Sequence, residues 1–151
     1  MRDEEERKGK REYPLNAVRV CIDSCGDEIC GRIYSRMSEE CLVFKNAAQL
    51  LQRTDRLLDV CGYPQAFQIK RSFAPEGAAA GRHALPEFIL GEEKVTGQRG
   101  NLCTLDIFIG SRRRTSWQGY ITDEKEASVK YRSELELLRE IWRVVKAERE
   151  P

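Results

Sequence analysis

Two stretches of this sequence repeat the same order of residue types. Residues 28–51 read EICGRIYSRMSEECLVFKNAAQLL, and residues 115–138 read TSWQGYITDEKEASVKYRSELELL. An offset of 87 residues places Tyr131 over Phe44. In both copies a glycine interrupts an apolar alternation, a charged turn follows, and a polar residue precedes a pair of leucines. This similarity constrains the fold strongly, because two copies of one pattern should adopt the same local structure.

Each copy predicts three β-strands. Apolar residues alternate with others over residues 18–22 and again over residues 105–109, which is the period-two pattern of a half-buried strand. The next strand contains Gly31 in one copy and Gly119 in the other. A glycine inside a strand predicts a bulge or a close approach of two backbones. The segments CLVF and SVKY then predict a third, short strand.

A helix follows the third strand in each copy. Asn46 and Ser133 are favourable N-cap residues, and Gln49 and Glu136 stand three positions later, so both copies spell a capping box. Residues at spacings of three and four then predict one buried face on each helix. They are Leu50, Leu51, Thr54, Leu57 and Leu58 in the first copy and Leu137, Leu138, Ile141, Val144 and Val145 in the second.

These patterns predict an α+β protein made of two tandem β-β-β-α repeats, packed as a pseudo-twofold pair with two main helices. The strands should pair as antiparallel sheets, because the hairpin connections are too short for crossovers. One three-stranded unit with one helix has a marginal core, so each copy would cover the other. Whether the copies share one sheet or form two stays open, and chance similarity of two β-rich segments is the alternative to a duplication.

The repeats divide the chain of 151 residues into four parts. The helix of the first copy should end near Gly62, because Pro64 prevents its continuation. An edge strand at residues 66–73 and a short strand at residues 87–90 would follow, with residues 91–101 as a loop. We expect a disordered charged tail over residues 1–14, the first repeat plus its edge strand over 15–74, an Ala/Gly/Pro-rich linker with the short strand over 75–101, and the second repeat over 102–147.

Charge and hydropathy indicate a cytoplasmic protein. The 26 basic and 25 acidic residues nearly cancel, giving a net charge of +1, which argues against a dedicated nucleic-acid coat protein. The N-terminal residues MRDEEERKGKREYP contain no apolar core of a signal peptide. The chain also has no apolar run of about 18 residues, so we expect no membrane-spanning helix.

The sequence offers no constellation of catalytic or metal-binding residues. The six cysteines form no pair of zinc knuckles, His83 is the single histidine, and the expected cytosol keeps thiols reduced. Phosphate-binding, serine-hydrolase and metalloprotease motifs are all missing. Asp23, Asp106 and Asp123 lie in or near strands, where exposed carboxylates are common. We therefore expect no enzymatic activity, no metal and no cofactor.

The hairpin SRRRTSWQG is the strongest candidate for a binding site in the sequence. Arg112, Arg113 and Arg114 could clamp phosphates, and an exposed Trp117 could stack on a base, with Lys70 and Arg71 as a second basic pair. The alternative is a solvated turn with the tryptophan in the core, which its alignment with Ile29 favours. The matching hairpin of the first copy is acidic (GDE), so the halves would present opposite charges.

The C-terminal helix offers a second candidate surface. Trp142 joins Leu135, Leu138 and Val145 at helical spacing. Such a stripe is more often part of the core than an interface, so we interpret it as core.

The second copy, residues 103–145, resembles a set of short bacterial proteins. In these proteins a strand with polar or basic residues at its end leads into W-Q-G, and an aromatic residue, a cap residue and L-E-L-L follow. The first copy departs from this pattern, with Ile29-Cys30-Gly31 in place of W-Q-G. The resemblance implies a bacterial origin and residence in the cytosol. It carries over no site residues, because no function is known for the set.

Two hypotheses about function remain at this point. The first is a small non-enzymatic binding or regulatory module, with a protein partner or a second copy of itself as its ligand. The alternative is a module that binds nucleic acid or another phosphate ligand through residues 112–114. Binding to phosphates should weaken steeply as the salt concentration rises, which separates the two.

Overall fold

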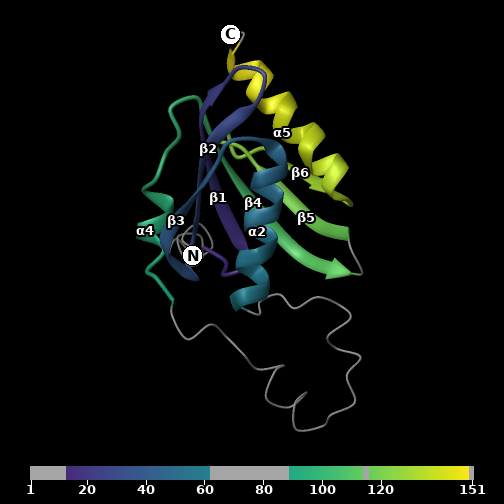
Figure 1. The fold of residues 1–151 in the computed structure, drawn as a ribbon. Helices are drawn as coiled ribbons and strands as arrows, with labels where there is room; N and C mark the ends of the chain where they lie inside the picture. Colours follow the sequence, from purple (N-terminus) through teal and green to yellow (C-terminus); the bar gives the residue numbers. More distant parts are fainter. Residues whose placement is uncertain (1–12, 62–88, 114–115, 150–151) are drawn as a thin grey trace, which may run out of the picture.

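The computed structural model of the protein describes residues 13–61, 89–113 and 116–149. These residues form one six-stranded antiparallel sheet with two long helices over one of its faces (Figure 1). The strands are β1 (Ala17–Cys25), β2 (Ile29–Ser35), β3 (Ser38–Phe44), β4 (Cys103–Arg113), β5 (Ser116–Thr122) and β6 (Ser128–Tyr131). The helices are α2 (Ala47–Cys61), α4 (Glu93–Thr96) and α5 (Glu134–Arg149).

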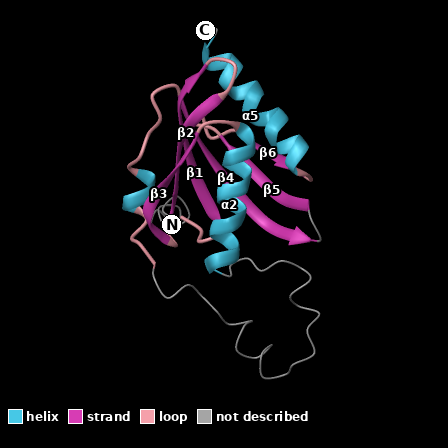
Figure 2. Ribbon diagram, viewed as in Figure 1, coloured by secondary structure: helices cyan, strands magenta, loops and turns pink. Residues whose placement is uncertain are grey.

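The strand order β3-β2-β1-β4-β5-β6 places β1 beside β4 in the middle of the sheet (Figure 2). Val18 lies opposite Ile107, and Val20 lies opposite Leu105. The α+β class and the antiparallel pairing predicted from the sequence are thus confirmed. All six strands join in a single sheet, which answers the question that the sequence left open.

The main core lies between the sheet and the two long helices. The alternating residues of β1 and β4 point into it, and Leu50 and Leu58 of α2 and Leu137 and Ile141 of α5 meet them there. Nearly all of these side chains have no exposed surface. The period-two strands and the helical faces predicted around them are therefore confirmed. Burial of this apolar surface is the main source of the stability of the fold.

Both glycines inside the strand patterns stand next to a β-bulge. Gly31 lies opposite Ile22, and the register of β1 against β2 shifts directly after that pair. Gly119 lies opposite Ile109, and the register of β4 against β5 shifts directly after it. A Cβ atom at Gly31 would overlap the carbonyl oxygen of Cys21, and one at Gly119 would overlap that of Phe108. The bulges and the close approaches predicted from the sequence are both present.

Both predicted caps are confirmed, but the return hydrogen bond of each box goes to the backbone N–H of the residue before the cap and not to that of the cap itself. The Asn46 Oδ1 atom accepts a hydrogen bond from the Gln49 backbone N–H at 2.7 Å, and the Gln49 side chain accepts one from the Lys45 backbone N–H at 2.9 Å. In α5 the Ser133 Oγ atom accepts from the Glu136 backbone N–H at 3.2 Å, and Glu136 accepts from Arg132 at 2.9 Å. The side chains thus satisfy backbone donors that a helix start leaves without intrahelical partners.

Replacing either cap residue by alanine should therefore lower the stability measurably. We expect Asn46→Ala and Ser133→Ala each to reduce the free energy of unfolding by about 1 kcal/mol, because each leaves a backbone N–H without its acceptor. Urea titrations of the two variants measure this loss. Asn46→Gly is the matched control and should cost only a few tenths of that amount, since glycine is itself a tolerated cap. Unchanged unfolding in both alanine variants would contradict the prediction.

The connection between the two halves differs from the predicted loop. Residues 93–96 form the one-turn helix α4, whose Val95 is fully buried against Tyr13 and Ala17 on the second face of the sheet. Tyr13 thus belongs to the folded part of the chain, although the sequence placed it in the charged tail. Ile89 and Leu90 are not in a strand, and the remainder of the short strand, the edge strand and residues 1–12 lie outside the described residues.

The core-facing stripe predicted on the last helix is wrong in part. Leu135 is 66% exposed, and Leu138 and Trp142 are only partly buried. The buried face of α5 consists of Leu137, Ile141, Val144 and Val145. The predicted stripe and the observed buried face are rotated from each other by roughly 100° around the helix axis, which corresponds to about one residue. The face that includes the paired leucine Leu137 was the correct prediction.

Candidate functional site

The β4–β5 hairpin is packed against α2. Arg112 is only 5% exposed, and its Nη1 atom donates hydrogen bonds to Asp59 at 2.6 Å and to Asp55 at 3.1 Å. Trp117 is 4% exposed, and its indole Nε1 donates to the same Asp55 carboxylate at 3.2 Å. Burial of Trp117 confirms the interpretation that it belongs to the core. The structure thus brings Arg112 and Trp117 together, but as parts of the contact between the hairpin and the helix.

The other four predicted site residues give no test of the hairpin hypothesis. Arg113 ends β4, but its side chain lies outside the described residues. Arg114, Lys70 and Arg71 lie entirely outside them. A phosphate site at these residues therefore stays a prediction.

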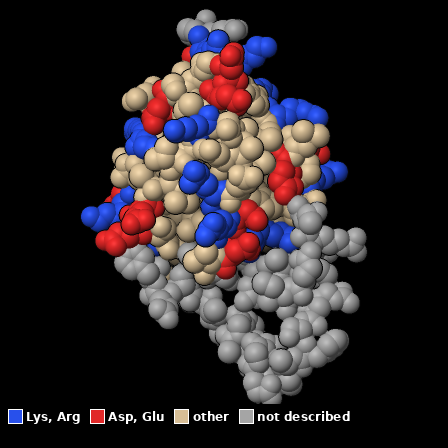
Figure 3. Space-filling view, in the orientation of Figure 1, with Lys and Arg blue, Asp and Glu red and all other residues tan. Residues whose placement is uncertain are grey.

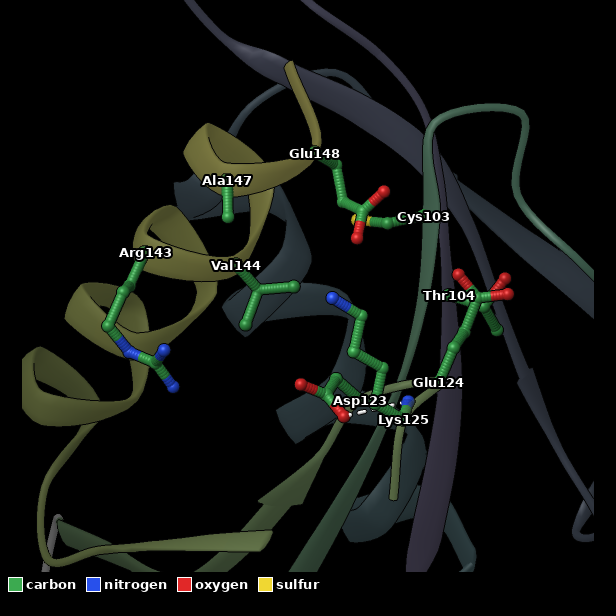
Figure 4. A pocket seen from close by; sticks show the side chains of 9 residues that line it. All are labelled: Cys103, Thr104, Asp123, Glu124, Lys125, Arg143, Val144, Ala147 and Glu148. Atoms are coloured by element: carbon green, nitrogen blue, oxygen red, sulfur yellow. Dashed lines mark hydrogen bonds between the residues drawn. The ribbon is translucent and has the colours of Figure 1, made fainter. Parts of the chain in front are cut away.

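Two hollows flank the β5–β6 turn, residues 123–127, and they form the best candidate site among the described residues. The first has a volume of about 320 Å³ and lies between the turn and α5 (Figure 4). The second has a volume of about 260 Å³ and lies on the face of the sheet away from the two long helices, where Thr96 of α4 is part of its lining. Both hollows are lined by Thr104, Asp123 and Glu124. The turn therefore separates one hollow from the other.

Hydrogen bonds hold this turn in one shape. The Asp123 Oδ1 atom accepts from the backbone N–H groups of Lys125 at 2.9 Å and Ala127 at 3.0 Å. The Asp123 N–H in turn donates to the Ala127 carbonyl at 3.2 Å. Glu126 has a φ of 65°, the left-handed conformation that a non-glycine residue rarely adopts. A braced turn of this kind presents its side chains at fixed positions.

The first hollow combines an apolar wall with a free cation. Cys103, Val144 and Ala147 supply the apolar part. The Lys125 side chain extends into the hollow, and its ammonium makes no hydrogen bond or ion pair with any described residue (Figure 4). Burial, followed by the carboxylates of Glu148 and Glu124, raises the pKa of the Cys103 thiol to about 12. The thiol is therefore protonated at neutral pH and is no nucleophile there.

The second hollow is bordered by an ion pair at the centre of the sheet. Arg19 binds the Asp106 carboxylate through two nitrogens, at 3.0 Å and 2.8 Å, and also donates to the Thr96 carbonyl at 2.7 Å. The Tyr13 hydroxyl donates to Asp106 at 2.6 Å. Burial and the Asp106 carboxylate raise the pKa of Tyr13 well above its usual value. These contacts occupy the Asp106 carboxylate, and through them it holds the connection around α4 against the sheet.

A second ion pair holds the same connection. Arg32 binds Asp23 through two nitrogens, each at 2.9 Å, and donates to the Arg99 carbonyl at 2.8 Å. The Asn101 backbone N–H donates to Asp23 at 3.0 Å. The hydrogen bonds from Arg32 and Asn101 outweigh the effect of burial and lower the pKa of Asp23. The Asp23 carboxylate therefore stabilises the folded chain in its ionised form.

This lowered pKa predicts a loss of stability in acid. The contribution of Asp23 is fully present above the ordinary aspartate pKa of about 4 and is lost as the pH falls through the lowered value. Asp23→Asn should cost about 1–2 kcal/mol at neutral pH, because it weakens hydrogen bonds to a charged group. The variant should also lose less stability than the wild type on acidification to about pH 3. Urea titrations at both pH values measure the difference, and equal losses would contradict the assignment.

Sequence reasoning missed the two hollows, although it named Asp123 as a carboxylate near a strand. The segment DEKEA carries the signal of a turn, since aspartate commonly bonds to backbone N–H groups a few residues on. The hollows themselves depend on where α5 passes the turn, which no local pattern states. Basic and acidic side chains are interspersed on the face of the molecule that Figure 3 shows. No helix in the described residues is long and apolar enough to cross a membrane.

Comparisons with known proteins add no relative to this picture. A scan of protein-family models, a search of curated proteins and a search of solved structures each found no significant match to the chain. The candidate site is therefore defined by the geometry of the two hollows and the turn between them.

Proposed function

We propose that this chain is a non-enzymatic, cytoplasmic binding module that holds a protein partner at the β5–β6 turn. The observation that supports the proposal is a braced turn between two hollows, one of which contains the free ammonium of Lys125 beside an apolar wall. A partner protein that binds around the turn would place side chains in both hollows at once. Hollows of about 320 and 260 Å³ suit one or two side chains each rather than a large cofactor.

The bonding of the carboxylates supports binding rather than catalysis. Asp106 is bound to Arg19, Asp123 accepts two backbone hydrogen bonds, and Glu124 pairs with Arg99 at 3.1 Å. These three carboxylates already have partners in the fold, and Glu126 and Glu148, which also line the hollows, are exposed. A general acid or base needs instead a carboxyl group that is open to substrate and tuned by its surroundings.

Co-purification with one charge reversal tests the proposal. We expect Lys125→Glu to lose a protein that the wild-type chain captures from the native cell, since it reverses the free charge of the first hollow. Lys146→Glu is the matched control, because Lys146 is also exposed but does not line either hollow. Retention of the partner by Lys125→Glu, or equal loss in both variants, would refute the site.

We further infer that the two halves arose by duplication of one β-β-β-α unit. The supporting observations recur at equivalent positions: a glycine beside a bulge in the second strand, and a capping box at the start of the long helix. The strand order also reads the same outward from the central pair β1–β4 on both sides. In such a pair, a pseudo-twofold axis would pass between β1 and β4.

A further inference from the structure

Among the residues that the structure describes, only one half of the sheet face away from the long helices is covered. The connection around α4 lies over β1 and the neighbouring parts of β2 and β4, where Val95, Tyr13 and Ala17 form a buried cluster with Tyr34 and Phe108 packed against it. On β5 and β6 the outward residues Gln118, Tyr120, Ser128 and Lys130 are exposed. Among the described residues, therefore, half of this face is open.

A row of aromatic and basic side chains runs from Phe108, at the edge of the covered half, to the exposed Tyr120 and Lys130 in the open half. Phe108, Tyr120 and Lys130 lie opposite one another on β4, β5 and β6, so their side chains point to the same side of the sheet. The rings of Phe108 and Tyr120 have centroids 6.1 Å apart with planes tilted by 38°. Tyr120 is 47% exposed, which leaves much of its side chain open to solvent.

The charges around this row favour an anionic ligand at one end of it. Lys130 makes no ion pair with a described residue. Asp106, which lies two residues from Phe108 on the same strand, is neutralised by the two-nitrogen contact with Arg19. The unneutralised carboxylate of Glu126 lies in the β5–β6 turn, beyond Thr122 and Ser128. An anion would therefore bind beside Lys130 and avoid the turn.

We propose that this row, the open-face platform of Phe108, Tyr120 and Lys130, binds single-stranded nucleic acid. A flat sheet face with an exposed aromatic ring stacks an unpaired base, and an adjacent lysine contacts its phosphate. Gln118 and the hydrogen-bonded hydroxyls of Thr122 and Ser128 border the ring and offer polar contacts to a base edge. The bases of a duplex are stacked on one another and cannot occupy the ring in this way. This site is separate from the proposed protein site and does not depend on it.

Fluorescence anisotropy with short labelled RNA and DNA single strands at low salt tests the platform. Tyr120→Ala should weaken binding by about tenfold through lost stacking, and Tyr120→Phe should retain most of the affinity. Lys130→Glu should also weaken it, whereas Lys146→Glu, on the helix side of the sheet, should not. Glu126→Gln should strengthen binding, since it removes a like charge. The salt dependence should correspond to about one phosphate contact, a slope near −0.7.

Several results would overturn this proposal. They are the absence of binding to either single strand at low salt, a labelled duplex bound as tightly as a single strand, and equal losses in Lys130→Glu and Lys146→Glu. The Lys125→Glu variant tests whether the nucleic-acid site is independent of the protein site. If it loses the protein partner but keeps the oligonucleotide, the two sites are distinct, and failure of one leaves the other standing.

Discussion

Gly119→Ala should be among the most destabilising single substitutions in this chain, with a loss of at least about 3 kcal/mol in the free energy of unfolding. The added methyl group would overlap the Phe108 carbonyl oxygen, which belongs to the backbone of the neighbouring strand and cannot rotate away. To remove this overlap, β4 and β5 would have to move apart next to the β-bulge in their pairing. Urea unfolding and the thermal midpoint both measure the loss.

Two further alanine variants make this prediction specific. Gly31→Ala should cost a similar amount, because its methyl group would overlap the Cys21 carbonyl oxygen in the same way. Gly26→Ala is the control, since a Cβ atom there meets nothing within 4 Å. A mild effect at Gly119, or a cost at Gly26 as large as at Gly119, would show that close backbone contact is not the cause.

The second large effect is expected at Arg112. Arg112→Ala should lower the free energy of unfolding by about 2–3 kcal/mol, because it removes a buried side chain and the hydrogen bonds that tie the β4–β5 hairpin to α2. Asp55 and Asp59 are about half exposed, so water can solvate them once the guanidinium is gone. This limits the cost. Urea unfolding of the variant at neutral pH gives the value.

Arg143→Ala is the matched control for Arg112. Arg143 binds Glu140 at 2.7 Å, but its side chain is 57% exposed, and exposed pairs of this kind contribute less than about 1 kcal/mol. The two variants therefore separate the effect of burial from that of an ion pair alone. Similar small losses in both would mean that the hairpin is held by other contacts. If Arg112→Ala also released the hairpin, protease cleavage near it should increase.

The strands and the two long helices could be predicted because their signals are local. Alternation over residues 18–22 and 105–109 and the capping boxes at Asn46 and Ser133 each depend on neighbours in sequence. The helix α4 gave no such signal, since it has four residues and no side-chain cap. It is fixed by the burial of Val95 against the second face of the sheet, a contact that only the fold creates.

The site could be predicted even less, because its parts come from distant positions. The partners of Arg112 on α2 lie 53 and 57 residues away in sequence, so a run of arginines looked like an open basic hairpin. The hollow beside Lys125 needs Val144 and Ala147 from α5 to close it. The open-face platform needs three strands in register. No sequence motif or residue spacing predicts any of these three arrangements.

The central Arg19–Asp106 pair has a consequence for the duplication proposed above. The two residues stand 87 positions apart, at matching places in the two halves, and they face each other across β1 and β4. In an assembly of two identical subunits, symmetry would set arginine against arginine or aspartate against aspartate there. Joining both halves in one chain permits opposite charges to meet at the centre. Once they do, neither half can be exchanged for a second copy of the other without like charges repelling at the seam.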